Sequence, residues 1–509
     1  MDRDRLPVIV GAGQVTLHNQ QWPDIAGPVD VAAEAVRAAA ADACAPVLGQ
    51  VDHLSVAPVM SWDYGNAPEL LAERLGLGPG ERRYLDVGGN TPQQAVADVA
   101  GRLQRGEIEA AIVCGAECSA GKRNAKRSGH LVDWGRSAVP LEREHVDATD
   151  MPTEAELRHS VVRPMEIYPL WEPALRAAAG RTVAEHAAAI GSMLAAMTEV
   201  AAANPYAWKR EVRAGAELMA PRPDNRMTAL PYTLACNSYM RVDMGAAVIL
   251  TTAALAAELG VPTDRLVYVW SAADAVDVHA VTERVGYDHS PAMRICAERC
   301  LGLAGIDAED VDLFDLYSCF PSAVQLAAEA LGIGTDDPRG MTVTGGMAAF
   351  GGPWNDYVTH SIATMACELR SRPGAVGVVT GNGGYVGKHS WGLYASRPPV
   401  TAFGRNDVGA DQAAIDAEAH PRMDLDTEAA ATVDGYTVTF GRDGEPEQAI
   451  VLARLDAGRR TLAATYDRDT CEALCEGDWY GATISVGPAG RLDPLTPGGW
   501  PCAVRRPGP

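Results

Sequence analysis

Apolar residues occur in short continuous runs along this chain, and between these runs they recur at every third or fourth position. In the first 115 residues, the runs at 7–11, 54–59 and 110–115 predict buried strands, whereas 31–44 and 95–103 carry apolar residues at helical spacing. Buried strands that alternate with helices are typical of a mainly parallel sheet covered on both faces. The pattern therefore predicts an α/β fold.

The same alternation returns after residue 243. A strand at 244–250 and a helix at 253–259 complete the first run, and a second run starts with a strand at 266–270. The elements predicted after it are helices at 292–303, 322–331 and 357–370 and strands at 311–317, 376–380 and 391–394. Two α/β runs of similar order predict an internally duplicated architecture, although the sequence contains no literal repeat.

Two regions depart from this alternation. Residues 121–225 are rich in charge and in helix formers, and an insertion of about 100 residues is long for a connection, so we predict a helical loop subdomain that covers a site. Residues 399–509 show short strands at 436–440, 450–455 and 482–486, which predict a separate C-terminal β barrel of the OB type. The other two predicted domains are residues 1–120 together with residues 226–262, and residues 263–398.

Composition narrows the possible partners. The 509-residue chain has a net charge of -23, which disfavours nucleic acids and anionic membranes because both need a basic surface. The sequence shows no basic leader and no uninterrupted apolar run of the roughly 20 residues that a membrane span needs. The 11 cysteines form no CxxC pair, so we expect reduced thiols, a cytoplasmic location and no metal.

The stretch 84–94 has the most informative local pattern. An apolar strand is followed by Gly88 and Gly89 and then by the start of a helix, where Asn90 or Thr91 can act as the N-cap and Pro92 suits the first turn. Anions and nucleophiles favour such a helix start, because its free amides and its dipole stabilise negative charge. In this chain glycine stands where a reactive side chain would be expected.

The order of these elements, together with several short motifs, resembles the thiolase superfamily. The similarity covers about residues 5–398 and is closest to the acetyl-CoA acetyltransferases and the sterol-carrier-protein thiolases. It is carried by residues 8–14, by 242–247, by Gly345-Gly346 and by the glycine loop at 381–385. The resemblance implies a duplicated thiolase fold with five layers (α-β-α-β-α), a role in lipid metabolism, CoA thioesters as ligands and no other cofactor. It also implies a homodimer formed through the N-terminal sheet, with a monomer as the alternative because the appended C-terminal domain could block that interface.

Thiolases exchange acyl groups between a cysteine and CoA, with a second cysteine or a histidine as base, and this chain departs from their motifs. The nucleophile loop matches Gly88-Gly89-Asn90, with Gly88 at the cysteine position. The Gly-His-Pro loop matches Gly351-Gly352-Pro353, and the final Cys-x-Gly loop begins at Gly381. Without a thiolate no acyl-enzyme forms, so we expect neither thiolysis nor Claisen condensation.

Four side chains remain as catalytic candidates. Tyr317 and Cys319 lie in the loop that matches Asn-Glu-Ala-Phe, or His-Asp-Cys-Phe in the sterol-carrier relatives. Tyr317 could donate a hydrogen bond to an enolate oxygen or act as a general acid; the alternatives are a packed tyrosine and a buried thiol. His389 and Tyr385 follow the last glycine loop, and the alternative for each is a structural role.

The glycine turns are the predicted substrate-binding elements, because backbone amides without a nearby Cβ allow a thioester carbonyl to approach closely. The predicted binding residues are Gly88, Gly89, Asn90, Gly345, Gly346, Gly352, Gly383 and Gly384.

Two classes of function remain open for this chain. The first is a protein that binds CoA or acyl-CoA, with or without catalysis. The second is a lyase that cleaves a 3-hydroxyacyl-CoA by a retro-aldol step, which needs a base and an oxyanion site but no cysteine.

Overall fold

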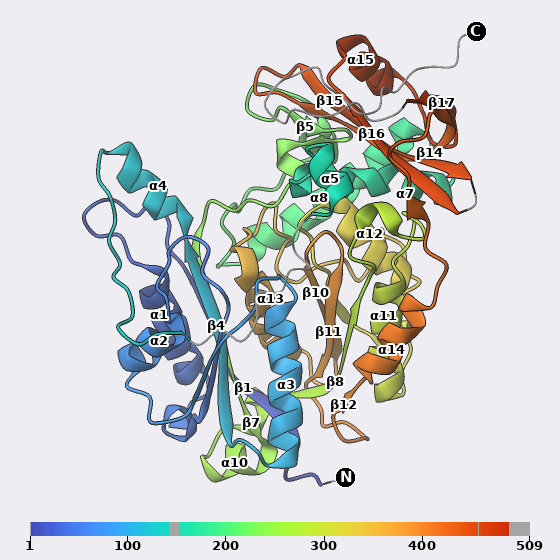
Figure 1. Cartoon of the computed structure of the whole chain (residues 1–509). Helices are drawn as coiled ribbons and strands as arrows, with labels where there is room; N and C mark the ends of the chain where they lie inside the picture. The colour runs from blue at the N-terminus through green and yellow to red at the C-terminus, as the bar shows by residue number, and fades with distance from the viewer. Residues whose placement is uncertain (1, 142–151, 457, 488–509) are drawn as a thin grey trace.

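Two half-sheets joined edge to edge form the centre of the molecule. The computed structural model describes residues 2–141, 152–456 and 458–487 (Figure 1). In this part of the chain the central strands follow the order β3-β2-β4-β7-β1-β8-β11-β10-β9, and β12 pairs with β8. The first half contains β1 (Pro7–Thr16), β2 (His53–Val56), β3 (Glu81–Tyr84), β4 (Ala110–Cys118) and β7 (Asp243–Thr252). The second contains β8 (Val267–Val276), β9 (Leu313–Asp315), β10 (Val376–Gly383), β11 (Lys388–Ala395) and β12 (Gly404–Arg405).

The pairing within the two halves is the same, which confirms the predicted duplication. In the first half β1 is antiparallel to β7, β7 is antiparallel to β4, and β4 is parallel to β2. In the second half β8, β11, β10 and β9 repeat these three relations in the same order. The halves meet where Val8 and Ile9 of β1 pair with Tyr268 and Val267 of β8.

Helices complete the five layers that the sequence predicted. The outer face of the first half is covered by α1 (Pro28–Asp42) and α2 (Ala67–Leu75), and α10 (Ala253–Glu258) follows β7. The outer face of the second half carries α11 (Pro291–Ala304) and α12 (Pro321–Ala330). Between the half-sheets lie α3 (Thr91–Arg105) and α13 (Tyr357–Ser371), which contact strands of both halves (Figure 1). The apolar residues of α3 at helical spacing, Val96, Val99 and Leu103, are fully buried as expected for this layer.

In the structure the inserted region runs from residue 119 to residue 233, beyond the predicted 121–225, and folds into short helices around one long helix. Its elements are α4 (Ser119–Arg127), α5 (Glu154–Arg158), α6 (Pro164–Ile167), α7 (Glu172–Ala178), α8 (Val183–Ala203), α9 (Gly215–Met219) and the hairpin strands β5 (Met227–Ala229) and β6 (Tyr232–Thr233). The helix α8 is long and apolar enough to cross a membrane, whereas the apolar runs of the sequence predicted no membrane-spanning segment. One face of this helix, with Ile190, Leu194 and Met197, is packed into the main core, and the core helix of a folded domain meets the same criterion.

The C-terminal region forms a small sheet, as its short strands predicted, and the OB type of this β structure stays a prediction. Its elements are α14 (Val408–Asp416), β13 (Arg422–Met423), β14 (Ala429–Phe440), β15 (Pro446–Asp456), β16 (Arg459–Thr465), α15 (Arg468–Glu476) and β17 (Thr483–Val486). The described strands follow the order β13-β16-β15-β14-β5-β6, with β17 paired to β14, and no described pairing closes this path. The hairpin β5–β6 comes from the inserted region and extends the sheet beside β14, which sequence patterns could not reveal.

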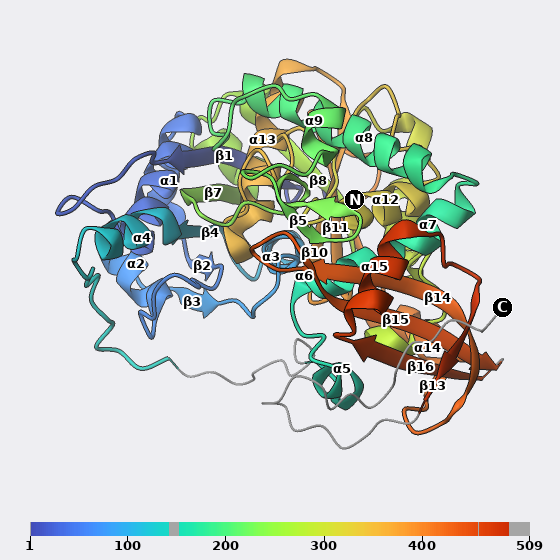
Figure 2. The ribbon, with the colours of Figure 1, turned by 90° about the horizontal axis from the view of Figure 1, so that it is seen from above.

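Both faces of this second sheet are buried. Alternate residues of β15, Ile450 and Leu452, join the core that contains Tyr168 and Trp171 of the inserted region. Ala449, Val451 and Ala453 point to the other face and pack with Cys471 and Leu474 of α15. Seen from above, the sheet therefore lies against the inserted region (Figure 2). The four-domain division stays a prediction.

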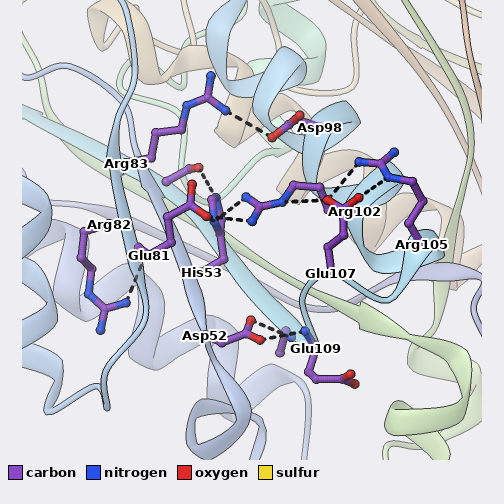
Figure 3. Close-up of polar contacts among 12 residues, drawn as sticks. Asp52, His53, Glu81, Arg82, Arg83, Asp98, Arg102, Arg105, Glu107 and Glu109 are labelled. Atoms are coloured by element: carbon purple, nitrogen blue, oxygen red, sulfur yellow. Dashed lines mark hydrogen bonds and ion pairs between the residues drawn. The ribbon is translucent and has the colours of Figure 1, made fainter. Parts of the chain in front are cut away.

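Charged side chains surround the edge strand β3. Arg102 of α3 donates to Glu81 Oε2 at 2.7 Å and lies 3.1 Å from the Nδ1 atom of His53, and Arg83 donates to Asp98 at 3.2 Å (Figure 3). His53 is buried, and burial lowers its pKa. Charges on an edge strand discourage pairing with a further strand. The predicted homodimer through this sheet stays a prediction.

His360 of the central layer makes stability depend on pH. Its Nδ1 donates to Gln14 Oε1 at 2.8 Å, its Nε2 has no hydrogen-bond partner among the described residues, and burial lowers its pKa to about 3. In the unfolded chain the imidazole of His360 takes up a proton below about pH 6.5, whereas in the folded chain it does so only at far lower pH. The contribution of the neutral imidazole to the free energy of unfolding is therefore complete above pH 6.5 and is lost as the pH falls toward 3.

We predict that His360→Gln flattens the fall in the free energy of unfolding between pH 6.5 and 4, by up to about 1.4 kcal/mol per pH unit. Urea unfolding at several pH values measures this slope. His130→Gln, at an exposed position, is the matched control and leaves the slope unchanged. Equal slopes for wild type and His360→Gln would contradict the prediction.

Candidate functional site

Four loops meet at the N-terminus of α3, as the resemblance implied. The Gly88 N–H donates to Asn355 Oδ1 at 2.9 Å, and the Asn355 amide nitrogen donates to the Pro58 carbonyl at 3.0 Å. Asn90 is the N-cap residue by position, but its side chain makes no capping hydrogen bond. The Thr91 hydroxyl instead donates to the Gly88 carbonyl at 2.9 Å, which closes the turn.

The hydroxyl of Tyr317 fills the space that a side chain at residue 89 would need. A Cβ atom built on Gly89 would overlap the Tyr317 hydroxyl and would lie 2.6 Å from the Asn382 carbonyl oxygen. Real Cβ atoms essentially never approach other heavy atoms this closely. Tyr317 and a nucleophile at residue 89 therefore exclude each other.

The side chain of Asn90 fills the space next to this hydroxyl. A Cβ atom on Gly88 would lie 2.5 Å from Asn90 Oδ1, and one on Gly383 would overlap the same oxygen. Gly381 is equally close, because its Cβ would lie 2.8 Å from the Asn90 Cα. A side chain at Gly88 would thus meet Asn90 and Thr91 of the same turn. The geometry favours Gly89, rather than the predicted Gly88, as the position that faces the converging loops.

Burial keeps the thiol of Cys319 and the phenol of Tyr317 protonated. Burial raises the pKa of Cys319 to about 12, so at neutral pH its sulfur is a thiol rather than a thiolate. Burial, with Cys319 and Tyr357 close by, raises the pKa of Tyr317 well above its usual value. The centre therefore offers a neutral phenol that can donate a hydrogen bond, and no thiolate nucleophile.

Several polar atoms of this centre are unsatisfied. Asn382 donates to the Tyr168 hydroxyl at 3.1 Å, and that hydroxyl donates to the Gly384 carbonyl at 3.1 Å. The Oδ1 atoms of Asn90 and Asn382, residues only 5% and 2% exposed, have no hydrogen-bond partner in the described part of the chain. No described residue hydrogen-bonds the Tyr317 hydroxyl either. Buried polar atoms without partners are costly and are commonly satisfied by water or a ligand.

His389 and Tyr385 are not brought into this cluster. His389 faces the opposite side of β11, where its Nε2 lies 3.6 Å from Asp277 Oδ2 and 3.3 Å from the Val386 carbonyl. The Tyr385 hydroxyl donates to the Val162 carbonyl at 2.7 Å, toward the inserted region. The side chain of Lys388 points to the α3 side, where it donates to the Val87 carbonyl at 3.0 Å. The strand alternation at 388 and 389 thus gives His389 a structural environment.

A cavity of about 130 Å³ lies beside Ser318, between α8 and the Gly345-Gly346 loop. Gly345 has a φ of +112° and lies against the backbone of Ala201, so only glycine lets α8 come this close. Gly346 lies next to Met197 of α8. Gly352 does not line this cavity, and a Cβ there would overlap the hydroxyl of Ser238. Of the predicted binding glycines, Gly345 lines the cavity and Gly346 packs against Met197, which is another of its lining residues.

Charged side chains of both signs, Lys209, Glu211 and Arg213, line one part of this cavity, and Arg213 is ion-paired with Glu217. Lys209 donates to the Ala348 carbonyl at 3.2 Å and lies 3.8 Å from the centroid of the Tyr239 ring. Burial, followed by the charge of Arg213, lowers the pKa of Lys209 to about 8. The side chains of Leu194, Met197 and Met347 supply the apolar part. The cavity can accept a small apolar group with a negative or polar neighbour.

Sequence reasoning missed Asn355, Tyr168 and Lys209. Asn355 lies two residues after the Gly351-Gly352-Pro353 motif, so its position next to a matched loop was the available signal. Tyr168 and Lys209 belong to the inserted region, where neither periodicity nor a motif marks them.

Comparisons with known proteins relate this chain to thiolases and thiolase-like proteins. Residues 411–491 match a family described as "Thiolase-like protein type 1 additional C-terminal domain". The peroxisomal 3-ketoacyl-CoA thiolase 2 of Arabidopsis thaliana is 30% identical over 140 residues, an alignment that spans 28% of this chain and 28% of that protein.

Solved structures extend the similarity to the whole chain. A monomeric SCP2-thiolase-like protein type 1 from Mycobacterium smegmatis is 31% identical, covers 100% of both chains and has a TM-score of 0.83. The Ltp2-ChsH2(DUF35) aldolase has a TM-score of 0.58 and is 20% identical over 78% of this chain and 100% of its own, which shows the fold alone.

We predict that Gly89→Cys destabilises the protein by about 1–3 kcal/mol, because the new side chain overlaps Tyr317. Tyr317→Ala should remove that overlap, so the double variant should lose less stability than the two single losses added together. Urea unfolding of the four proteins measures this coupling. Gly49→Cys is the matched control, since nothing lies within 4 Å of a Cβ at that position.

Additive losses in the double variant would show that Tyr317 and residue 89 do not compete for space. Neither Gly89→Cys nor Gly88→Cys should restore thiolysis, because Gly352 and Gly381 still supply no base.

Proposed function

Because this chain belongs to the thiolase superfamily and carries an additional C-terminal domain, we propose that it binds a CoA thioester without forming an acyl-enzyme. The observation that carries the proposal is the Tyr317 hydroxyl, which fills the space of a side chain at residue 89. Covalent acyl transfer needs a nucleophile at that place. Binding needs only the scaffold and a cavity.

The cavity beside Ser318 is the proposed place for the thioester end of the ligand. Its apolar wall suits a short acyl or pantetheine segment, and Lys209 and Arg213 suit nearby carbonyl or phosphate oxygens. At about 130 Å³ it is smaller than typical drug-sized sites, which favours one small group rather than a whole cofactor. Gly345 and Gly346 keep α8 close enough to form the wall.

We predict that acetyl-CoA and longer acyl-CoAs bind the protein in isothermal titration calorimetry, and that no acyl group is transferred to it. Ala348→Phe narrows the cavity and should weaken binding about tenfold, or ~1.4 kcal/mol. Ala196→Phe, on the exposed face of α8, is the matched control and should leave the affinity unchanged.

Intact-mass spectrometry after incubation with acyl-CoA checks the second half of this prediction. An added acyl mass would contradict non-covalent binding, and the absence of any heat of binding at millimolar acyl-CoA would contradict the binding itself.

A retro-aldol lyase acting on a 3-hydroxyacyl-CoA is the second candidate. In such a step a base removes the hydroxyl proton, the Cα–Cβ bond breaks, a carbonyl product leaves, and the resulting enolate of the shorter acyl-CoA takes up a proton at Cα. The specific observation that favours it is the protonated, unpartnered hydroxyl of Tyr317, which could donate to the enolate oxygen. The aldolase that shares this fold adds support.

If this candidate holds, incubation with 3-hydroxyacyl-CoAs of several chain lengths should release an aldehyde or ketone, and Tyr317→Phe should reduce the rate at least a hundredfold. Tyr480→Phe, at an exposed position of the C-terminal region, is the control. If no 3-hydroxyacyl-CoA of any chain length releases a carbonyl product, the lyase hypothesis is contradicted and the proposed binding function remains.

A further inference from the structure

A second cavity, of about 420 Å³, lies between the inserted region and the hairpin that joins β14 to β15. Arg163 and Arg226 enter it from the inserted region, and Thr439, Arg442 and Glu447 enter it from the C-terminal sheet. This cavity is distinct from the centre at Gly89, because none of the residues of that centre line it.

Positive charge dominates its lining. Arg163 is bound to Glu166, and one nitrogen of Arg226 donates to the Met227 carbonyl at 2.8 Å. Arg442 has no hydrogen bond or ion pair with any described residue. Glu447 is the one acidic side chain among the lining residues, and it forms no ion pair with these arginines in the described structure. Three guanidinium groups therefore gather in one hollow of a chain whose net charge is -23.

An unsatisfied hydroxyl lies in the same cavity wall. Thr439 is only 3% exposed, and its Oγ1 has no hydrogen-bond partner in the described residues. It lies where the register of β14 and β15 shifts, between Thr439 and Phe440. A buried hydroxyl without a partner costs about 1–3 kcal/mol, and a ligand oxygen would remove that cost.

We propose that this cavity binds the phosphoryl group of a small phosphorylated molecule. Guanidinium groups hold phosphate oxygens by charge-assisted and often bidentate hydrogen bonds, and the Thr439 hydroxyl adds a neutral donor. A volume of about 420 Å³ matches small-molecule sites, which also occur preferentially between domains. The proposal does not depend on acyl-CoA binding at the Ser318 cavity.

The phosphoryl group could come from coenzyme A, from a free nucleotide or from inorganic phosphate, so the titration uses probes for each. Isothermal titration calorimetry with 3′-phosphoadenosine 5′-phosphate should show binding, and adenosine, which has no phosphate, should bind at least tenfold more weakly. Binding of CoA but not dephospho-CoA would identify the 3′-phosphate of CoA as the recognised group. Binding of inorganic phosphate alone would identify the free ion.

Arg442→Gln should weaken every phosphate probe at least tenfold, and Thr439→Val should weaken it several-fold. Arg459→Gln is the matched control, because Arg459 lies on the same sheet but is ion-paired with Asp424 and Asp456. Arg442 has no described partner, so its variant should keep the thermal midpoint of the wild type. Lack of binding of all phosphate probes, or equal affinities for wild type and Arg442→Gln, would overturn the proposal.

Discussion

The architecture around the candidate centre depends on the missing Cβ at residue 89. The start of α3 lies so close to the end of β10 and to the Tyr317 loop that a Cβ there would overlap a hydroxyl and a carbonyl. Gly88 and Gly383 extend the same constraint, because the Asn90 side chain occupies the space beside them, and Gly381 lies against the Asn90 backbone. In a close-packed interior such contacts leave no room for a thiol. The absence of a nucleophile at residue 89 and the tight packing of the two halves therefore depend on each other.

The C-terminal sheet changes the environment of the inserted region. Pairing of Ala229 with Thr439 continues the sheet from one region into the other, so the hairpin β5–β6 and β14 form one hydrogen-bonded unit. Arg460 of β16 adds buried polar contacts between the C-terminal sheet and the rest of the chain. It donates to the Arg284 carbonyl at 2.6 Å and pairs with Asp434 at 3.1 Å. Breaking a buried charge pair of this kind typically costs about 3–5 kcal/mol. The additional region is thus part of the folded body.

Apolar periodicity predicted the duplicated α/β fold well, because buried strands and amphipathic helices leave a direct trace in the sequence. The motif order also located the loops at Gly88, Tyr317 and Gly381, which meet at the start of α3, whereas the Gly345 loop lies against α8. The extension of the C-terminal sheet by two strands from residues 227–233 could not be predicted, because strand pairing over such a separation leaves no periodic trace. The orientation of the buried His389 away from the centre at Gly89 depends on the alternation along β11, and the lowered pKa of Lys209 depends on burial, so neither could be read from a motif.

Both proposed binding places lie at boundaries of the inserted region and not at the catalytic centre of the family. One cavity forms where α8 meets the Gly345-Gly346 loop, with Lys209 and Arg213 in its wall. The other forms where Arg163 and Arg226 face the β14–β15 hairpin. In a chain with a net charge of -23, hollows lined by arginine and lysine focus positive potential locally and can hold anions that the rest of the surface repels. Tyr317 and Asn90 fill the space beside residue 89, whereas the two cavities lie where the inserted region meets the Gly345-Gly346 loop and the C-terminal sheet. Both proposed binding places therefore depend on side chains of the inserted region.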